Sequence, residues 1–365
     1  MKFAFITTNL AGGGAEKALL KLALALQQRG HEVHLVLLEH RIAHAVPDGV
    51  AIHALTAPQR SLSKAAWAKP LAAWRLRRLT TRLAQAARFD MVVSTLPYAD
   101  EIALRARLPR HWCRIANTLS AEIARLRSRD PAKARRRLRR YQRLYRHAQL
   151  IAVSGGVAAD LRDAIGLTQA RVERIYNPFD AAAIRAAAAE AVSPPRPAAP
   201  YVIHVGRFNP QKRHDLLLDA YARLKVPHAL VLLTDPAPAL TEMIARRGLA
   251  ERVQVVGFQP NPYPWIAGAA LLVLCSDHEG LPNVIIEALI LGVPVVSTDC
   301  PSGPREILGA NCPDCLVPVN DPTALAAAIE HTLADRRGPP QVDLRPFDVG
   351  HAVAAYERLA AQSHI

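Results

Sequence analysis

Short runs of apolar residues alternate with amphipathic helical patterns along most of the chain. The first unit runs from a strand-like segment at residues 2–7, through the loop Gly12-Gly13-Gly14 and a helical pattern ending at Gly30, into the apolar run HEVHLVLL. Further strand-like runs occur at residues 91–95, 150–156 and 171–178. Alternation of this kind predicts an α/β protein with a parallel, doubly wound sheet.

The alternation is interrupted once, by an alanine-rich and then proline-rich stretch. We interpret residues 181–200 as a linker between an N-terminal Rossmann-like domain at residues 1–180 and a C-terminal domain at residues 201–349. The amphipathic pattern at about 350–365 predicts a final helix that can pack back on the first domain. A length of 365 residues suits two domains. Such domains bind ligands at the carboxyl ends of their strands, so we expect the site in the cleft between them.

The positive charge is confined to one half of the chain. The net charge is +15, but residues 1–180 hold 31 of the 46 Lys and Arg residues and 13 of the 31 Asp and Glu residues. Their net charge is therefore +18, against −3 for the rest. A basic half favours an anionic surface or a polyanion as partner.

Cysteine content and apolar run lengths indicate a cytoplasmic protein. Five cysteines are an odd and sparse set, which argues for a reducing compartment. Cys312 and Cys315 have metal or redox spacing but no second pair, so coincidence or a local disulfide explains them better. The first apolar run is too short for a signal peptide, and none of the later ones reaches about 20 residues.

Two features match the chemistry of phosphate binding. The loop Gly12-Gly13-Gly14 follows a strand and opens a helix, so its amides can approach a phosphate, although a tight turn explains it as well. Arg207 follows the strand-like YVIHV, and Lys212 lies shortly after it. Two fixed cations at a strand end suit a diphosphate, and an ordinary exposed pair is the alternative.

The segment CSDHEGLPNVIIEAL adds two carboxylates at a loop and helix. Glu279 precedes a loop whose amides can face an anion or sugar hydroxyls, and Glu287 lies in the helix that follows. A dipole-complementing role explains Glu279 but not Glu287, because a carboxylate in an apolar helix is costly without a partner. Vicinal hydroxyls are a suitable partner for Glu287.

These motifs together resemble the retaining GT-B glycosyltransferases of family 4, particularly the bacterial branch that builds envelope polysaccharides and lipid-linked oligosaccharides. The matching segments are GGGAEK, HVGRF with Lys212, GFQPNPYPW, CSDHEGLPNVIIEAL and GVPVVSTDCPSGPREIL. The match is highly specific in the second half and patchy in the first. The resemblance implies two Rossmann-like domains facing an interdomain cleft, with residues 1–180 as the acceptor-side domain and residues 201–349 as the nucleotide-sugar-binding domain. It also implies a hexosyltransferase activity.

The resemblance also implies a role for each matching position. Arg207 and Lys212 would clamp the donor diphosphate, and Glu279 would hold the transferred sugar. It implies a UDP-sugar donor, retained anomeric configuration and no metal or other cofactor, because the two cations supply the countercharge. The donor-binding positions would be Gly13, Gly14, Phe258, Gln259, Gly280, Leu281, Pro282, Asn283 and Glu287, of which Glu287 would bind the ribose.

The acceptor side departs from the family pattern. Related enzymes often carry a histidine before the asparagine of a segment like RIANTLS, whereas Ala116 stands there in this chain, so no base is assigned. Ser94, Tyr98, Asp100 and Asn117 are candidates for lining the acceptor, and structural turn residues are the alternative.

Two basic segments predict a peripheral membrane face. The stretch from Arg125 to Arg146 holds eleven Lys and Arg residues and one acid, and the stretch from Trp67 to Arg78 combines tryptophans with arginines. Clusters of four to eight basic residues suffice for binding an anionic leaflet. We therefore expect a lipid-linked acceptor at the inner face of the cytoplasmic membrane. A soluble glycosyltransferase with a sugar acceptor is an alternative, and a nucleic-acid-binding protein is disfavoured because no recognition motif accompanies the arginines.

Overall fold

The computed structural model describes residues 1–43, 46, 49–309, 311–335 and 338–362. The chain divides into two compact units. Unit 1 comprises residues 1–178 and 345–365, and unit 2 comprises residues 179–344.

Unit 1 is built on a seven-stranded parallel sheet with the strand order β3-β2-β1-β4-β5-β6-β7. This order extends the Rossmann arrangement by one strand. The strands are β1 (Lys2–Thr7), β2 (Glu32–Leu37), β3 (Ala51–Ala54), β4 (Met91–Thr95), β5 (His111–Ile115), β6 (Gln149–Ala152) and β7 (Arg171–Arg174). The helices are α1 (Gly14–Gln28), α2 (Lys69–Leu83), α3 (Pro97–Ala106), α4 (Leu119–Arg127), α5 (Pro131–Tyr145), α6 (Gly155–Ala159) and α14 (Val349–Gln362), with short turns η1 (Ala66–Ala68), η2 (Asp160–Ala164) and η5 (Arg345–Phe347).

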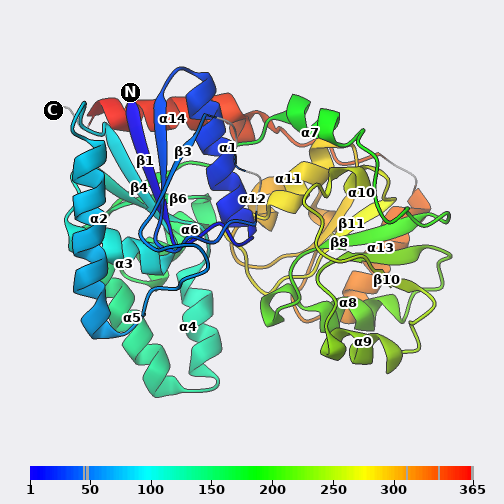
Figure 1. Ribbon diagram of the computed structural model, residues 1–365. Helices are drawn as coiled ribbons and strands as arrows, with labels where there is room; N and C mark the ends of the chain where they lie inside the picture. The colour runs from blue at the N-terminus through cyan, green and yellow to red at the C-terminus, as the bar shows by residue number, and fades with distance from the viewer. Residues whose placement is uncertain (44–45, 47–48, 310, 336–337, 363–365) are drawn as a thin grey trace. The chain divides into compact units, whose positions relative to one another are not determined.

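The central strand β1 is apolar on both sides because helices cover both faces of the sheet. Phe3 and Phe5 pack in one buried cluster with residues of α1 and α14, whereas Ala4 and Ile6 pack in another with residues of α2 and α3. Side chains alternate along a strand, so each face of the sheet receives every second residue. Figure 1 shows α14, the last helix of the chain, passing one end of α1, with which it is in contact.

Unit 2 is built on a six-stranded parallel sheet with the order β10-β9-β8-β11-β12-β13, which is also a Rossmann order. The strands are β8 (Tyr201–Val205), β9 (Ala229–Leu233), β10 (Val253–Val255), β11 (Leu271–Leu274), β12 (Val295–Thr298) and β13 (Leu316–Val317). The helices are α7 (Ala181–Ala187), α8 (His214–Tyr221), α9 (Pro238–Ala245), α10 (Tyr263–Ala267), α11 (Asn283–Ile290), α12 (Pro304–Leu308) and α13 (Pro322–Asp335), with short turns η3 (Pro210–Lys212) and η4 (Pro313–Cys315). The two sheets confirm the predicted doubly wound α/β architecture.

The segment that we interpreted as a linker begins with a helix that belongs to unit 2. In α7, Ile184 is buried, and Arg185 Nε donates a hydrogen bond to the Ile290 carbonyl at the end of α11. Asp180 caps the helix by accepting from the Ala183 amide. The chain therefore crosses from unit 1 to unit 2 at residues 178–179, ahead of the proline-rich stretch, and returns at residues 344–345.

Within the described parts of the chain, no helix is both long enough and apolar enough to cross a bilayer.

Candidate active site

Three loops of unit 2 that follow neighbouring strands are joined by hydrogen bonds. They follow β8, β11 and β12, whose carboxyl ends share one edge of the parallel sheet. The Asp277 amide donates to the Gln211 carbonyl at 2.9 Å, and Gln211 Nε2 donates to the His278 carbonyl at 2.7 Å. The Glu279 amide donates to the Pro301 carbonyl at 3.2 Å. These bonds hold the sequence-predicted motifs side by side.

Lys212 and Glu279 form an ion pair at the centre of these loops. Lys212 Nζ lies 2.6 Å from Glu279 Oε1, and the side chains are 19% and 10% exposed. Ser276 Oγ also donates to Glu279 Oε1 at 2.6 Å. Two residues that lie 67 positions apart are thus brought together, as a shared phosphate and sugar site requires. Sequence reasoning missed Ser276, which could have been noticed as the hydroxyl three residues before Glu279.

The approach of Lys212 to the sheet depends on Gly206. A Cβ at Gly206 would lie 3.3 Å from Lys212 Cδ and 3.4 Å from Lys212 Cε, so the glycine leaves room for the lysine stem. Asn209 Oδ1 caps the turn η3 by accepting from the Lys212 amide at 3.1 Å. Arg207, the other predicted cation, is exposed on the same loop. The loop therefore presents one fixed and one solvent-facing cation.

The loop from Gly280 to Pro282 leads into Asn283, the first residue of α11, and is packed against Gly303. A Cβ at Gly303 would lie 2.2 Å from Pro282 Cδ and 3.3 Å from the Leu281 Cα. The φ angle of Gly303 is +102°, a region that L-residues rarely adopt. Glycine is therefore required at this position for two reasons, the lack of space for a Cβ and the positive φ angle. The Ser-Gly-Pro turn is the sequence signal that could have identified it.

Glu287 lies on α11 between buried apolar residues and is itself only 6% exposed. The Tyr263 hydroxyl, from the start of α10, donates a hydrogen bond to Glu287 Oε1 at 3.2 Å. This hydrogen bond offsets part of the free energy needed to bury a carboxylate in an apolar helix. Sequence reasoning did not single out Tyr263, because only the packing of α10 on α11 brings it to Glu287.

The predicted nucleobase loop follows β10, which ends at the same edge of the sheet. Phe258 exposes 47% of its surface, Gln259 is half-buried, and Gly257 has φ +94°. An exposed aromatic ring on a loop that glycine turns sharply offers a flat surface for a base.

The glycine loop lies in unit 1, at the start of α1. Gly13 precedes the helix, Gly14 is its first residue, and Gly12 has φ +114°. Asn9, three residues before Gly12, donates from Nδ2 to Glu39 Oε2 at 3.3 Å. Glu39 Oε1 accepts from the Leu62 amide at 3.1 Å. Glu39 thus links the segment before the glycine loop to the loop that follows β3.

Two of the acceptor-side candidates lie in the core of unit 1, which corrects that expectation for them. Ser94 and Asp100 are each 0% exposed, and Ser94 Oγ donates to Asp100 Oδ1 at 2.5 Å. Tyr145 donates to Asp100 Oδ2 at 2.7 Å, and His111 Nε2 lies 2.8 Å from Ser94 Oγ. Burial raises the pKa of Asp100 to about 7, although both hydroxyl donors act to lower it. These side chains pack the fold and present no surface to an acceptor.

The other two acceptor-side candidates are partly exposed. The Tyr98 hydroxyl donates to the Ser63 carbonyl at 3.3 Å, and burial raises the Tyr98 pKa. Asn117 Oδ1 accepts from the Thr118 amide at 2.9 Å at the start of α4. Both remain accessible to a ligand of unit 1.

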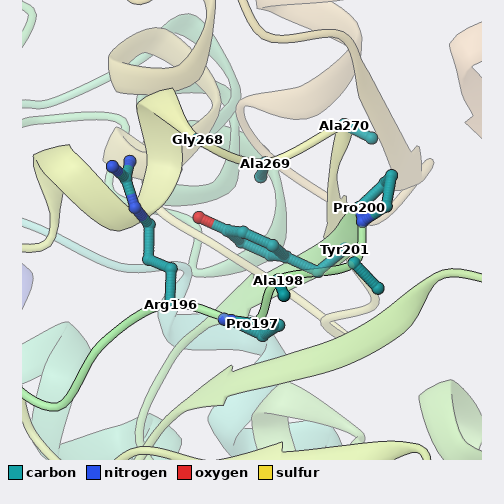
Figure 2. A pocket seen from close by; sticks show the side chains of 9 residues that line it. Arg196, Pro197, Ala198, Pro200, Tyr201, Gly268, Ala269 and Ala270 are labelled. Atoms are coloured by element: carbon teal, nitrogen blue, oxygen red, sulfur yellow. The ribbon is translucent and has the colours of Figure 1, made fainter.

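A shallow pocket of about 360 Å³ in unit 2 contains none of the predicted site residues. Figure 2 shows the Tyr201 ring extending toward Arg196 in this pocket. Arg196 Nη1 donates to the Pro264 carbonyl at 3.0 Å, and the Tyr201 hydroxyl donates to the Trp265 carbonyl at 2.6 Å. The two side chains thus bind carbonyls of α10, and the pocket is explained by the anchoring of this helix.

Cys312 and Cys315 form a local disulfide at the turn η4, one of the two outcomes expected from their spacing. In the described residues, no group of three or more histidine, cysteine or acidic side chains could hold a metal ion.

Comparison with known proteins identifies the family. Residues 12–183 match the family described as Glycosyltransferase Family 4, and residues 199–335 match the one described as Glycosyl transferases group 1. Together these two matches span most of the chain and show a family 4-like glycosyltransferase. The predicted family is therefore confirmed. This glycosyltransferase is 28% identical over 341 residues, 92% of its length and 90% of the relative's, to the N-acetylgalactosamine-N,N'-diacetylbacillosaminyl-diphospho-undecaprenol 4-alpha-N-acetylgalactosaminyltransferase of Campylobacter jejuni.

More distant relatives match over part of the chain or in fold. The lipopolysaccharide 1,6-galactosyltransferase of Salmonella typhimurium is 29% identical over 43% of this glycosyltransferase and 45% of its own length. The crystal structure of Anabaena HepE in complex with UDP and glucose has a TM-score of 0.71 at 19% identity, and covers 99% of this chain and 100% of its own. The galactosyltransferase WaaB has a TM-score of 0.64 at 19% identity and covers the whole of both chains. These likenesses confirm the predicted GT-B fold.

Proposed function

We propose that this glycosyltransferase moves a hexose from a UDP-sugar to a hydroxyl of a lipid-linked or envelope glycan, with retention of the anomeric configuration. The proposal rests on the ion pair between Lys212 and Glu279 at the strand ends of unit 2. An ammonium can bind a diphosphate oxygen, and the neighbouring carboxylate can accept hydrogen bonds from sugar hydroxyls. A nucleotide sugar carries both groups next to each other.

In this proposal, Lys212 and Arg207 neutralise the charge that develops on the departing diphosphate. Transfer breaks the bond between the sugar C1 and the diphosphate oxygen and forms a bond between C1 and the acceptor oxygen on the same face. UDP and the proton of the acceptor hydroxyl are released. Cations that meet a charge where it develops stabilise the transition state more than the ground state. The same two cations would supply the countercharge that a metal provides elsewhere, so no cofactor is invoked.

Two relatives and one structural neighbour support the nature of the substrates. HepE has been crystallised with UDP and glucose, and the Campylobacter relative is named for a diphospho-undecaprenol acceptor. The Salmonella relative is named for lipopolysaccharide. A donor with a uridine base and an acceptor on a polyprenyl diphosphate or another envelope glycolipid fit all three names.

An exposed apolar stripe on unit 1 supports docking on the cytoplasmic face of a membrane. Trp67, Leu71 and Trp74 lie at helical spacing over η1 and α2 and are 78%, 49% and 55% exposed. The Arg78 guanidinium lies 5.4 Å from the Trp74 ring centroid, and α2 has no acidic residue in its first turn. Aromatic residues beside arginines are typical of helices that lie in an anionic membrane interface.

The arginine-rich segment from Arg125 to Arg146 contributes fewer free charges than its composition indicates. Arg137 pairs with Glu122 at 2.6 Å, and Arg140 pairs with the buried Glu101. The remaining arginines of α5 are mostly exposed, so this helix can add electrostatic attraction beside α2. The exposed tryptophans favour a bilayer over nucleic acid and over a purely soluble enzyme.

A thermal-shift and hydrolysis screen with UDP-, GDP- and ADP-sugars tests the donor. We expect UDP-sugars to raise the melting temperature and to be hydrolysed slowly to UDP. Glu287→Ala should lose this response while keeping the melting temperature of the unliganded protein near that of the wild type. A wild-type protein that responds to none of these sugars would contradict the proposal.

A further inference from the structure

Tyr263 lies between the two predicted nucleoside contacts. It stands at the start of α10, five residues after Phe258 in the nucleobase loop, and its hydroxyl donates to Glu287 Oε1 at 3.2 Å. The side chain is half-buried, whereas Glu287 is 6% exposed. The ring therefore connects the loop predicted to receive the base with the carboxylate predicted to receive the ribose.

The start and the middle of α10 are anchored to the rest of unit 2. Before its first turn, Asn261 Oδ1 accepts from the Tyr263 amide at 3.1 Å, and Asn261 Nδ2 donates to the Ala187 carbonyl of α7 at 2.8 Å. Further along the helix, Arg196 and Tyr201 donate to the Pro264 and Trp265 carbonyls (Figure 2). A five-residue helix is not stable by itself, so these four hydrogen bonds fix the position of the backbone at Tyr263.

The Tyr263 bond restricts how the Glu287 carboxylate can turn. The terminal torsion of glutamate is broad, with no strong preference of its own. An ionised carboxylate offers about four acceptor positions, so the bond from Tyr263 narrows the orientations of the group without occupying every acceptor position. A carboxylate whose plane is fixed in advance loses less entropy when it binds two vicinal hydroxyls.

We propose that Tyr263 is a positioning residue that orients Glu287 toward the ribose hydroxyls, and that it thereby gives the site its preference for ribonucleoside over deoxyribonucleoside diphosphates. This inference rests on the proposed function, because it takes the ribose as the ligand of Glu287. Tyr263 acts through Glu287 and does not itself need to touch the nucleotide.

The experiment measures the dissociation constants of UDP and 2′-deoxy-UDP by calorimetry for the wild type, Tyr263→Phe and Tyr201→Phe. Tyr263→Phe removes only the hydroxyl, and we expect the preference for UDP to fall roughly three- to tenfold, the range of one typical hydrogen bond. Tyr201→Phe is the matched control, since it removes a tyrosine hydroxyl that anchors the same helix without contacting Glu287. It should lower the melting temperature and leave the preference for UDP unchanged.

A double variant separates positioning from general loosening of the helix. In a Glu287→Gln background, Tyr263→Phe should change the preference for UDP by less than twofold, because the carboxylate on which it acts is gone. An unchanged preference in Tyr263→Phe, or an equal loss in Tyr201→Phe, would overturn the inference. Wild-type protein that binds neither nucleotide would instead contradict the proposed function, so the two failures are distinguishable.

Discussion

Replacing Gly303 by alanine tests whether the loop at residues 280–282 is held in place by the turn that follows β12. The new Cβ would lie 2.2 Å from Pro282 Cδ, where ordinary contact begins at 3.4 Å, so the loop must move by about an ångström. Gly292→Ala is a matched control, because Gly292 also has a positive φ, +75°, but a Cβ there meets nothing within 4 Å. Both variants therefore place an alanine at a positive φ, and Gly303→Ala adds a steric clash.

The expected magnitudes follow from that difference. Gly292→Ala should lose about 1–2 kcal/mol through the strain of a positive φ, and Gly303→Ala should lose at least as much. Gly303→Ala should lose about 1–3 kcal/mol more through overpacking. Since about 1 kcal/mol shifts the melting temperature by about 2–4 °C in a domain of this size, Gly303→Ala should melt roughly 2–12 °C below Gly292→Ala.

Activity should separate the variants more strongly than stability. A displacement of about 1 Å near the reacting groups can cost about 100-fold in rate, so we expect Gly303→Ala to transfer sugar 10- to 100-fold more slowly, while Gly292→Ala stays within about twofold. The assay is UDP release at a temperature where all proteins are folded. Equal rates for the two variants would refute the role assigned to the turn at Gly303.

Three further predictions concern unit 1. As the pH is raised from 5 to 8, the melting temperature of Asp100→Asn should rise relative to that of the wild type. The folded-state pKa of Asp100 is raised from 3.8 to about 7, so the wild type loses stability as the pH rises across that window. Glu101→Gln should lower unfolding free energy by about 3–5 kcal/mol, because this buried carboxylate pairs with cations from three helices, whereas Glu242→Gln in an exposed pair should cost under about 1 kcal/mol. Trp67→Ser with Trp74→Ser should reduce flotation with anionic vesicles at low salt.

Each of these has a contradicting result. Parallel pH profiles for Asp100→Asn and the wild type would show that this carboxyl titrates normally. Equal destabilisation by Glu101→Gln and Glu242→Gln would show that burial does not strengthen the Glu101 cluster. Wild-type protein that stays in the supernatant with anionic vesicles would reject the membrane face.

The parts of the fold and site that depend on local pattern were predictable. Apolar runs separated by helical patterns predicted the architecture of both sheets. The sequence around Glu279 and Glu287 placed Glu279 in the loop after a strand and Glu287 on the following helix, α11. The strand β5 was missed because His111 and Arg114 are polar, yet both are buried. Ser94 contacts His111 and Asn177 accepts from Arg114, which offsets part of the cost of burying these residues, and a single sequence does not reveal these partners.

The remaining differences arise from tertiary packing. Ser94 and Asp100 follow the pattern of a polar strand end, but the start of α3 at Pro97 turns Asp100 inward to Ser94 and Tyr145. Tyr263 reaches Glu287 only because α10 packs on α11. In the same way, the alanine-rich stretch forms α7 because Ile184 finds a buried site in unit 2.

Transfer of a sugar from a UDP-sugar with retention at the anomeric carbon is the reaction that we propose for this chain. The most direct measurement is the anomeric configuration of the glycan formed from a UDP-α-sugar and a polyprenyl-diphosphate-linked acceptor, determined by the proton coupling at C1 in NMR. We expect an α-linked product together with stoichiometric UDP. A β-linked product, or product formation that Glu279→Gln and Lys212→Met leave unchanged, would contradict it.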